Sequence, residues 1–307
     1  MRKLTIGFLT LTIILSACSG YKMGQAQKNE KTEMQIKEDH GVIDYDVLEE
    51  QPVNSIRGGG RGAMDGLVGG AVSLATNAVK QIIAKDQAKY FTEYKYALTG
   101  LYFYDQLSSE GPFDPIGLQF NGFRLVRTFE NEGRIDTAMI ADFELDVQNP
   151  YEIINNSIFR LKLKDLKLNY AKVKVPSNNK ILNMDFEIVF NTSYATGQGQ
   201  LYKNIELGKF FFFLRNAPLD KTVPGYDEYY QNLKGKKIEG QSFIVPRSYG
   251  YHIGGNNTPA VSFSQGAYTI DVTVKESSKN KFVNQLIIDN SGKMVDVLGD
   301  QIKNKMK

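Results

Sequence analysis

Histidine, the side chain most often used for acid–base catalysis near neutral pH, occurs only at His40 and His252 in this chain of 307 residues. A His-based triad or a His-rich zinc site is hard to assemble from two such residues. The G-x-S-x-G, H-E-x-x-H and phosphate-loop motifs are also absent from the sequence. We therefore predict no catalytic residue, no metal site and no cofactor, and an enzyme is the least favoured class of function.

Acidic residues at alternate positions are the closest approach to a carboxylate site; they are Asp142, Glu144 and Asp146. Basic residues alternate in the same way in the next segment, at Arg160, Lys162 and Lys164. Alternate residues share one face of a strand, so we predict that the two segments pair through opposite charges on the solvent face. A one-residue bulge near Asp165 would keep both Leu163 and Leu166 in the core.

The segment from residue 245 to residue 266 combines aromatic and basic side chains with Gly/Asn turns. Its candidate binding residues are Arg247, Tyr249, Tyr251 and His252. This composition suits an exposed loop that binds a partner protein or a glycan. The alternative is a loop packed against the body, in which these residues have no binding role.

A glycine-rich stretch begins at residue 57, and its residues Gly58, Gly60 and Ala63 fit the G-x-G-x-x-A loop that binds dinucleotides. A working loop follows a strand and belongs to a β-α-β unit. Here a helix-like segment leads instead into sequence with the alternation of antiparallel strands. We therefore predict no nucleotide site.

The same stretch carries a glycine at every fourth position: Gly58, Gly62, Gly66 and Gly70. This spacing places small residues on one helix face, where another backbone can approach closely. It resembles the glycine-zipper segments of bacterial lipoproteins, which implies membrane insertion or close helix packing. Asp65, Asn77 and Lys80 would be costly in hydrocarbon, so we favour an amphipathic helix over residues 63–88 that packs on the body or on a neighbouring subunit.

The N-terminus has two basic residues, a short uncharged stretch and the sequence LSAC at residues 15–18. This is a secretory signal too short for a permanent transmembrane helix. It resembles the lipobox of bacterial lipoproteins, which implies cleavage after residue 17 and a lipid on Cys18, the only cysteine. By the sorting pattern of Gram-negative lipoproteins, Ser19 in place of Asp implies a lipid-anchored protein of the outer membrane, on its periplasmic or surface face. The alternatives are a transmembrane anchor and an ordinary cleaved signal.

Charge excludes one class of partner. The chain has 37 basic and 34 acidic residues, and removal of residues 1–17 takes away two basic residues and no acidic ones. The mature chain is therefore nearly neutral, without the basic field that nucleic acids require. We expect its partners to be the membrane, through the lipid on Cys18, and other envelope proteins or further copies of itself.

The order of segments predicts a signal peptide over 1–17, a flexible lipidated tether over 18–57, a Gly-rich entry and helix over 58–89, a β body over 90–290 and a helix over 291–307. A short strand within residues 42–48 is an alternative for the end of the tether. Apolar residues in the body alternate in runs at 118–129, 134–147, 157–175, 182–194, 198–214 and 267–275. These runs predict an antiparallel β-sandwich, either one large sandwich or two in tandem that divide near 176–181 or 216–240. We expect the run Phe210–Phe213 to be buried on both faces.

Residues 134–215, where Asn149 and Pro150 separate two strand-like runs, resemble the water-stress and hypersensitive-response domain of late-embryogenesis-abundant proteins. The resemblance implies a β-sandwich. Together these features predict a structural or accessory subunit of an outer-membrane assembly, such as a secretion apparatus, that acts through protein contacts. The alternative is an envelope module that binds carbohydrate or cell-wall polymer.

Overall fold

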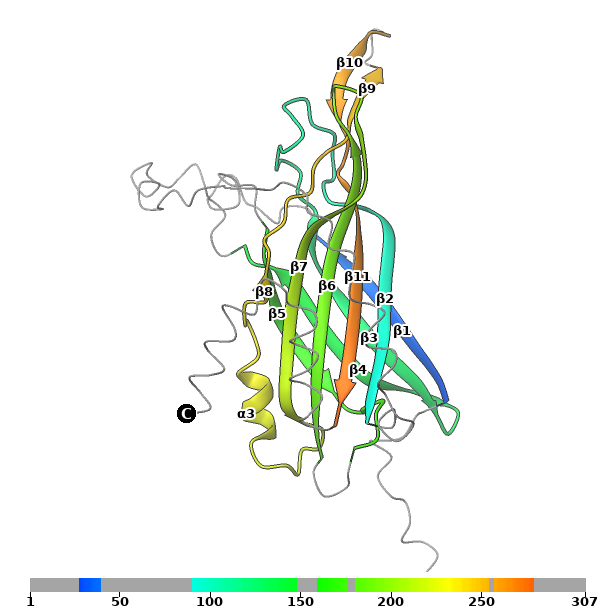
Figure 1. Ribbon diagram of the computed structural model, residues 1–307, viewed down its shortest axis with the longest axis vertical. Coiled ribbons are helices and arrows are strands. Elements are labelled where there is room, and N and C mark those ends of the chain that lie inside the picture. Colours follow the sequence, from blue (N-terminus) through cyan, green and yellow to red (C-terminus); the bar gives the residue numbers. More distant parts are fainter. Residues whose placement is uncertain (1–27, 40–89, 148–158, 176–179, 254–256, 279–307) are drawn as a thin grey trace, which may run out of the picture.

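The computed structural model describes residues 28–39, 90–147, 159–175, 180–253 and 257–278. In these residues the protein is mainly β, and every strand pair is antiparallel. Two sheets overlap as layers, and a separate hairpin extends beyond one end (Figure 1). The mainly β, antiparallel fold predicted from the alternating pattern is confirmed.

The first sheet has four strands in the order β1-β3-β4-β5. Their bounds are Lys28–Glu38 for β1, Phe120–Asn131 for β3, Arg134–Leu145 for β4 and Leu161–Leu168 for β5. The turn from β3 to β4 has two residues, Glu132 and Gly133, both with positive φ. Two-residue hairpins need this backbone, which glycine adopts without strain. We call the end of the molecule that carries this turn the base.

The second sheet has five strands in the order β2-β11-β6-β7-β8. Their bounds are Phe91–Tyr102 for β2, Ala267–Ser277 for β11, Ile181–Ala195 for β6, Leu201–Pro218 for β7 and Glu239–Gly240 for β8. The separate hairpin pairs β9, Tyr249–Ile253, with β10, Pro259–Phe263. The helix α3, Tyr226–Gln231, packs at the end of β7, where the Tyr230 hydroxyl donates to the Pro218 carbonyl at 2.8 Å.

Aromatic side chains join the two sheets. Phe143 of the first sheet contacts Phe186 and Phe212 of the second, with ring centroids 6.2 and 6.3 Å apart. Phe123, the cross-strand partner of Phe143, meets Phe190 of the second sheet at 6.4 Å. The buried residues form one cluster that includes side chains before residue 176, after residue 181 and within 216–240. The described body therefore has a single core, which is not divided at either predicted boundary.

The run Phe210–Phe213 differs from the prediction. Phe210 and Phe212 are buried, whereas Phe211 and Phe213 are half-buried. Neighbouring residues of a strand point to opposite faces, so two of the four rings lie on the outer face of β7. There the two rings lie parallel, with centroids 6.2 Å apart, and the Arg215 guanidinium covers Phe213 at 5.0 Å.

The predicted flexible tether over 18–57 is wrong for residues 28–38, which form the edge strand β1. Met34 and Ile36 of this strand pair with Leu125 and Phe123 of β3 and pack against the core. Burial of these two apolar side chains and the backbone hydrogen bonds to β3 offset the conformational entropy that the segment loses when it forms a strand. The alternative strand within residues 42–48 lies outside the described residues.

The predicted charge pairing and bulge in the first sheet are present. Lys162 and Lys164 of β5 form ion pairs with Glu144 of β4 at 3.3 and 3.0 Å. The register between β4 and β5 shifts by one residue, and Leu163 and Leu166 are both buried. Local alternation was sufficient to predict this feature.

The other two carboxylates pair with residues that the sequence did not indicate. Asp142 accepts two hydrogen bonds from Arg124, at 2.6 and 2.8 Å, and meets Lys37 at 3.3 Å. Burial raises the pKa of Asp142, but these two cations outweigh it and hold the pKa below its ordinary value. Asp146 pairs with Lys237 at 3.0 Å. The three carboxylates are thus engaged in cross-strand contacts.

Candidate functional site

The end of the molecule opposite the base exposes an unusual amount of apolar surface. β2 ends here, β11 begins here, and the β6–β7 turn and the β9–β10 hairpin project from it (Figure 1). Among the described residues, all the strongly exposed large apolar side chains except Ile135 lie at this end. We call this set the apical surface; its members are Tyr102, Leu107, Phe113, Ile116, Leu201, Tyr202, Ile205, Tyr251, Ile253 and Val261. Concentrations of exposed apolar side chains often mark interaction sites.

The β9–β10 hairpin is fixed to the body through Tyr249. Its ring packs against Phe263 of the paired strand, with centroids 5.8 Å apart, and against the β6–β7 turn at Gly197. A Cβ atom at Gly197 would approach that ring to 3.3 Å, so glycine allows the close contact. The Tyr249 hydroxyl donates to Tyr251 at 3.0 Å, which raises the pKa of Tyr249. Tyr251 and the adjoining Ile253 remain largely exposed.

The β6–β7 turn contributes a second aromatic pair. Tyr194 and Tyr202 are cross-strand partners whose rings stack at 5.1 Å with planes 16° apart. Leu201 beside them is exposed. Paired strands hold these rings in place, so a partner would meet a preorganised surface.

The third part of the apical surface is the loop of residues 105–117, held by the buried side chain of Arg247. Its guanidinium donates to the carbonyl oxygens of Gln106, Asp114 and Ile116 in this loop and of Ser264 beyond β10. It also covers the Tyr104 ring at 3.9 Å. Because its planar fork reaches several carbonyls at once, Arg247 joins the loop to the segment before β9.

Two of the three parts of the apical surface, the β6–β7 turn and the β9–β10 hairpin, have no charged residues, whereas the 105–117 loop contains Asp105, Glu110 and Asp114. No Asp, Glu, Lys or Arg occurs between Glu187 and Lys203 or between Arg247 and Asp271. These two segments supply the projecting turn and hairpin, and they are rich in Tyr, Ser, Gly, Asn and Gln. Antibody binding loops have a similar composition, because tyrosine gives contact area at low entropic cost and small polar residues adapt their hydrogen bonds.

Of the four residues predicted as a binding loop, the structure places Tyr249, Tyr251 and His252 together on β9. Tyr251 and His252 are exposed and Tyr249 is half-buried. Arg247 is buried, and its guanidinium is used by the carbonyls of the 105–117 loop, so it is not available to a partner. The packed-loop alternative therefore holds for Arg247 and, in part, for Tyr249, which packs on Phe263 and Gly197; the binding role of Tyr251 and His252 stays a prediction. Cys18 and the glycines at 58, 62, 66 and 70 lie outside the described residues, as do the predicted helices over 63–88 and 291–307.

Sequence reasoning missed the apolar residues of the 105–117 loop and of β7. The loop was not singled out, although Leu107, Phe113 and Ile116 interrupt its polar residues. The long uncharged segments that flank Tyr202 and Tyr251 were a usable signal. A solvent-exposed hairpin without charged residues is atypical of protein surfaces.

A buried ionic cluster near the base joins the two sheets. Glu276 of β11 accepts hydrogen bonds from Tyr94 at 2.8 Å and from Arg127 of β3 at 3.1 Å. Glu30 of β1 meets Arg127 at 3.7 Å and Lys172 at 3.0 Å. Burial lowers the pKa of Arg127, but the charges of Glu276 and Glu30 together with the neighbouring tyrosines outweigh it, and the pKa is raised. The Arg127 and Glu276 side chains are almost fully shielded from solvent, so the cluster is suited to holding strands together.

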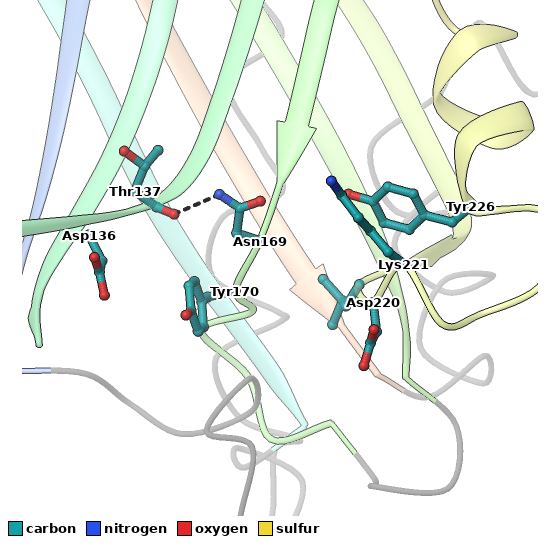
Figure 2. Close-up of a pocket in the computed structure, with 8 residues that line it drawn as sticks. Asp136, Thr137, Asn169, Tyr170, Asp220, Lys221 and Tyr226 are labelled. Carbon is teal, nitrogen blue, oxygen red and sulfur yellow. Dashed lines mark hydrogen bonds between the residues drawn. The ribbon is translucent and has the colours of Figure 1, made fainter.

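An open groove also lies at the base, where the two sheets separate (Figure 2). Its volume is about 390 Å³. We call it the basal groove; its residues are Asp136, Thr137, Asn169, Tyr170, Leu219, Asp220, Lys221 and Tyr226. No group of three metal-binding side chains occurs in the part of the chain that the structure describes.

In the same part of the chain, no helix is long and apolar enough to span a bilayer. No protein-family model, curated protein or solved structure matches the chain.

Proposed function

We propose that this protein is a lipid-anchored subunit of an outer-membrane assembly, such as a secretion apparatus, and that its apical surface binds a partner protein. The observation that carries the proposal is the concentration of exposed apolar side chains at one end, where the projecting turn and hairpin lie on segments without charged residues. Interfaces are depleted of charge at their centres and enriched in tyrosine, as this surface is. A partner that fits it has a mixed apolar and polar face with little net charge.

The position of β1 supports an orientation of this subunit on the membrane. Lys28 pairs with Glu130, next to the turn between β3 and β4, so the strand begins at the base. Nine residues lie between Lys28 and the proposed lipid on Cys18, and the ten Cα–Cα steps reach at most about 35 Å when fully extended. The base then faces the bilayer. β7 runs from the apical end to the base over 18 residues, which spans about 60 Å, so the apical surface is directed away from the membrane.

The proposal is tested by purification of complexes from detergent-solubilised membranes. Wild-type protein should be recovered in a stoichiometric complex, and Ile253→Asp at the apical surface should release it as a monomer. Ile135→Asp is a matched control, because Ile253 and Ile135 are 74% and 79% exposed at opposite ends of the molecule. Monomeric wild-type protein would contradict the proposal, and so would an equal effect of the two substitutions.

A further inference from the structure

The basal groove has the size and construction of a small binding site. Its volume, about 390 Å³, falls within the range of roughly 300–1,000 Å³ found for pockets that hold small ligands. One wall comes from the start of β4 and the residues after β5, and the other comes from the residues after β7 and the first residue of α3. Figure 2 shows Tyr170 and Asn169 on the first wall and Asp220, Lys221 and Tyr226 on the second.

The first wall is held rigidly. The backbone nitrogens of Asn169 and Tyr170 donate to the Ala138 carbonyl at 2.9 and 3.2 Å. The Asn169 side-chain amide donates to the Thr137 carbonyl at 3.0 Å, which fixes the amide plane. The Tyr170 ring meets Phe129 edge-on at 4.7 Å, and the Tyr170 carbonyl accepts a hydrogen bond from the buried Arg127. This wall is thus tied to the buried ionic cluster.

The second wall is fixed by Asp220. Its carboxylate accepts hydrogen bonds from the Lys180 ammonium at 2.6 Å and from the Thr222 backbone nitrogen at 2.9 Å. Its backbone carbonyl accepts from the Val223 nitrogen at 2.9 Å, and this turn leads into α3. The Tyr226 ring is half-buried and packs against Tyr230 at 4.8 Å, so its position is also set before a ligand arrives.

Charge in the groove is balanced. The carboxylates of Asp136 and Asp220 are matched by the cations of Lys221 and Lys180. The hydrogen bond from Lys180 lowers the pKa of Asp220 to about 2, so this carboxylate stays ionised at neutral pH. A charged ligand would lose hydration here without a net Coulomb gain. A neutral ligand with many hydroxyl groups can use both the acceptors and the donors.

We propose that the basal groove binds a neutral saccharide chain. Hydroxyl groups of the sugar donate to the carboxylates and accept from Asn169 and Lys221. The apolar C–H face of a sugar ring packs on the Tyr226 ring, because the face of an aromatic ring carries partial negative charge and the C–H groups carry partial positive charge. This site lies at the end of the molecule opposite the apical surface, and the proposal does not depend on the proposed protein partner.

Calorimetric titration of the full chain in detergent with the N-acetylglucosamine trimer, cellotriose and maltotriose tests this site. We expect saturable binding of at least one of the three. Tyr226→Ala should weaken that binding about tenfold, the loss of one good contact, while Tyr226→Phe, which keeps the ring, should retain most of it. Asn169→Ala is a second groove variant, and Tyr251→Ala at the apical surface should leave binding unchanged.

Three results would overturn the assignment: no saturable binding of any of these saccharides, binding that neither Tyr226→Ala nor Asn169→Ala weakens, or an equal loss in Tyr251→Ala. Thermal melting of each variant distinguishes loss of the site from loss of the fold. Retention of the partner complex by Tyr226→Ala would show that the groove and the apical surface act separately.

Discussion

Replacement of Arg247 by methionine should release the 105–117 loop without unfolding the sheets. Methionine fills much of the same space but donates no hydrogen bond. The carbonyl oxygens of Gln106, Asp114, Ile116 and Ser264 would each lose a bond from a charged donor. At roughly 1.5–3 kcal/mol for each bond, the upper limit of the loss is about 6–12 kcal/mol.

The expected loss is smaller, because the loop can lift and become hydrated. Gln106 and Ile116 are already exposed, so water can replace Arg247 at their carbonyls. We expect the free energy of unfolding to fall by about 3–5 kcal/mol, a large effect for one side chain. Arg247→Lys keeps the charge but not the planar fork, and should give an intermediate loss.

Urea denaturation measures the loss, and hydrogen exchange locates it. Exchange should accelerate at the amide of Ser108, which donates to the Phe263 carbonyl at 3.0 Å, and stay slow at Phe190 in the core. Lys203→Leu on the exposed surface of β7 is the control and should change stability by no more than about 0.5 kcal/mol. A loss below about 1 kcal/mol in Arg247→Met, or unchanged exchange at Ser108, would refute the role of Arg247 as the support of this loop.

Three further predictions concern the anchor, the buried cluster and acid stability. Cys18→Ala should abolish metabolic lipid labelling and release the protein from the membrane; continued labelling would refute the anchor. Glu276→Gln leaves the Arg127 charge without its closest buried partner, so the free energy of unfolding measured in urea should fall by about 3–5 kcal/mol. Arg127→Met combined with Glu276→Leu removes both charges and should lower the free energy of unfolding less. A larger loss in the double variant would contradict this account of the cluster. The pKa of Asp220 is lowered to about 2 by Lys180, so its contribution to stability is present above the unfolded-state pKa of about 3.9 and is lost as the pH falls toward 2. The melting temperature should therefore fall less steeply in Asp220→Asn than in wild type over this range, and identical slopes would contradict it.

The strands of the body could be predicted because their signal is local. Alternation along residues 134–168 indicated the pairing of β4 with β5, and the three-residue spacing of Leu163 and Leu166 indicated the bulge. The same rule, applied to Phe210–Phe213, should have placed two of the four rings outside. The prediction gave more weight to the cost of exposed phenylalanine than to the strand period. Both outer rings are half-buried, and Arg215 covers Phe213, so an outer face can hold them.

Strand β1 could not be recognised because the partners of its inward residues are distant in sequence. Glu30 is a carboxylate in a mostly shielded position, where it meets Arg127 and Lys172. From the sequence alone, Glu30 cannot be distinguished from the other polar residues of the predicted tether. Arg247 misled the prediction for the same reason, because the carbonyls that accept its hydrogen bonds in the 105–117 loop lie more than a hundred residues earlier.

The apical surface was predicted in part. Tyr251 and His252 were named, but the loop and the β6–β7 turn join them only through the fold, at contacts such as Ser108 with Phe263 and Gly197 with Tyr249. The basal groove had no sequence signal. Its walls come from segments that meet only in the folded structure, and Asp136 and Asp220 lie far apart in the chain.

Photocrosslinking at two positions tests the central claim most directly. A photoreactive amino acid is placed at Ile253 on the apical surface and, separately, at Ile135 near the base, in the lipidated protein in intact cells. The account predicts a crosslink to one envelope protein from position 253 and none to that protein from position 135. A crosslink of equal yield from both positions, or none from position 253, would contradict it.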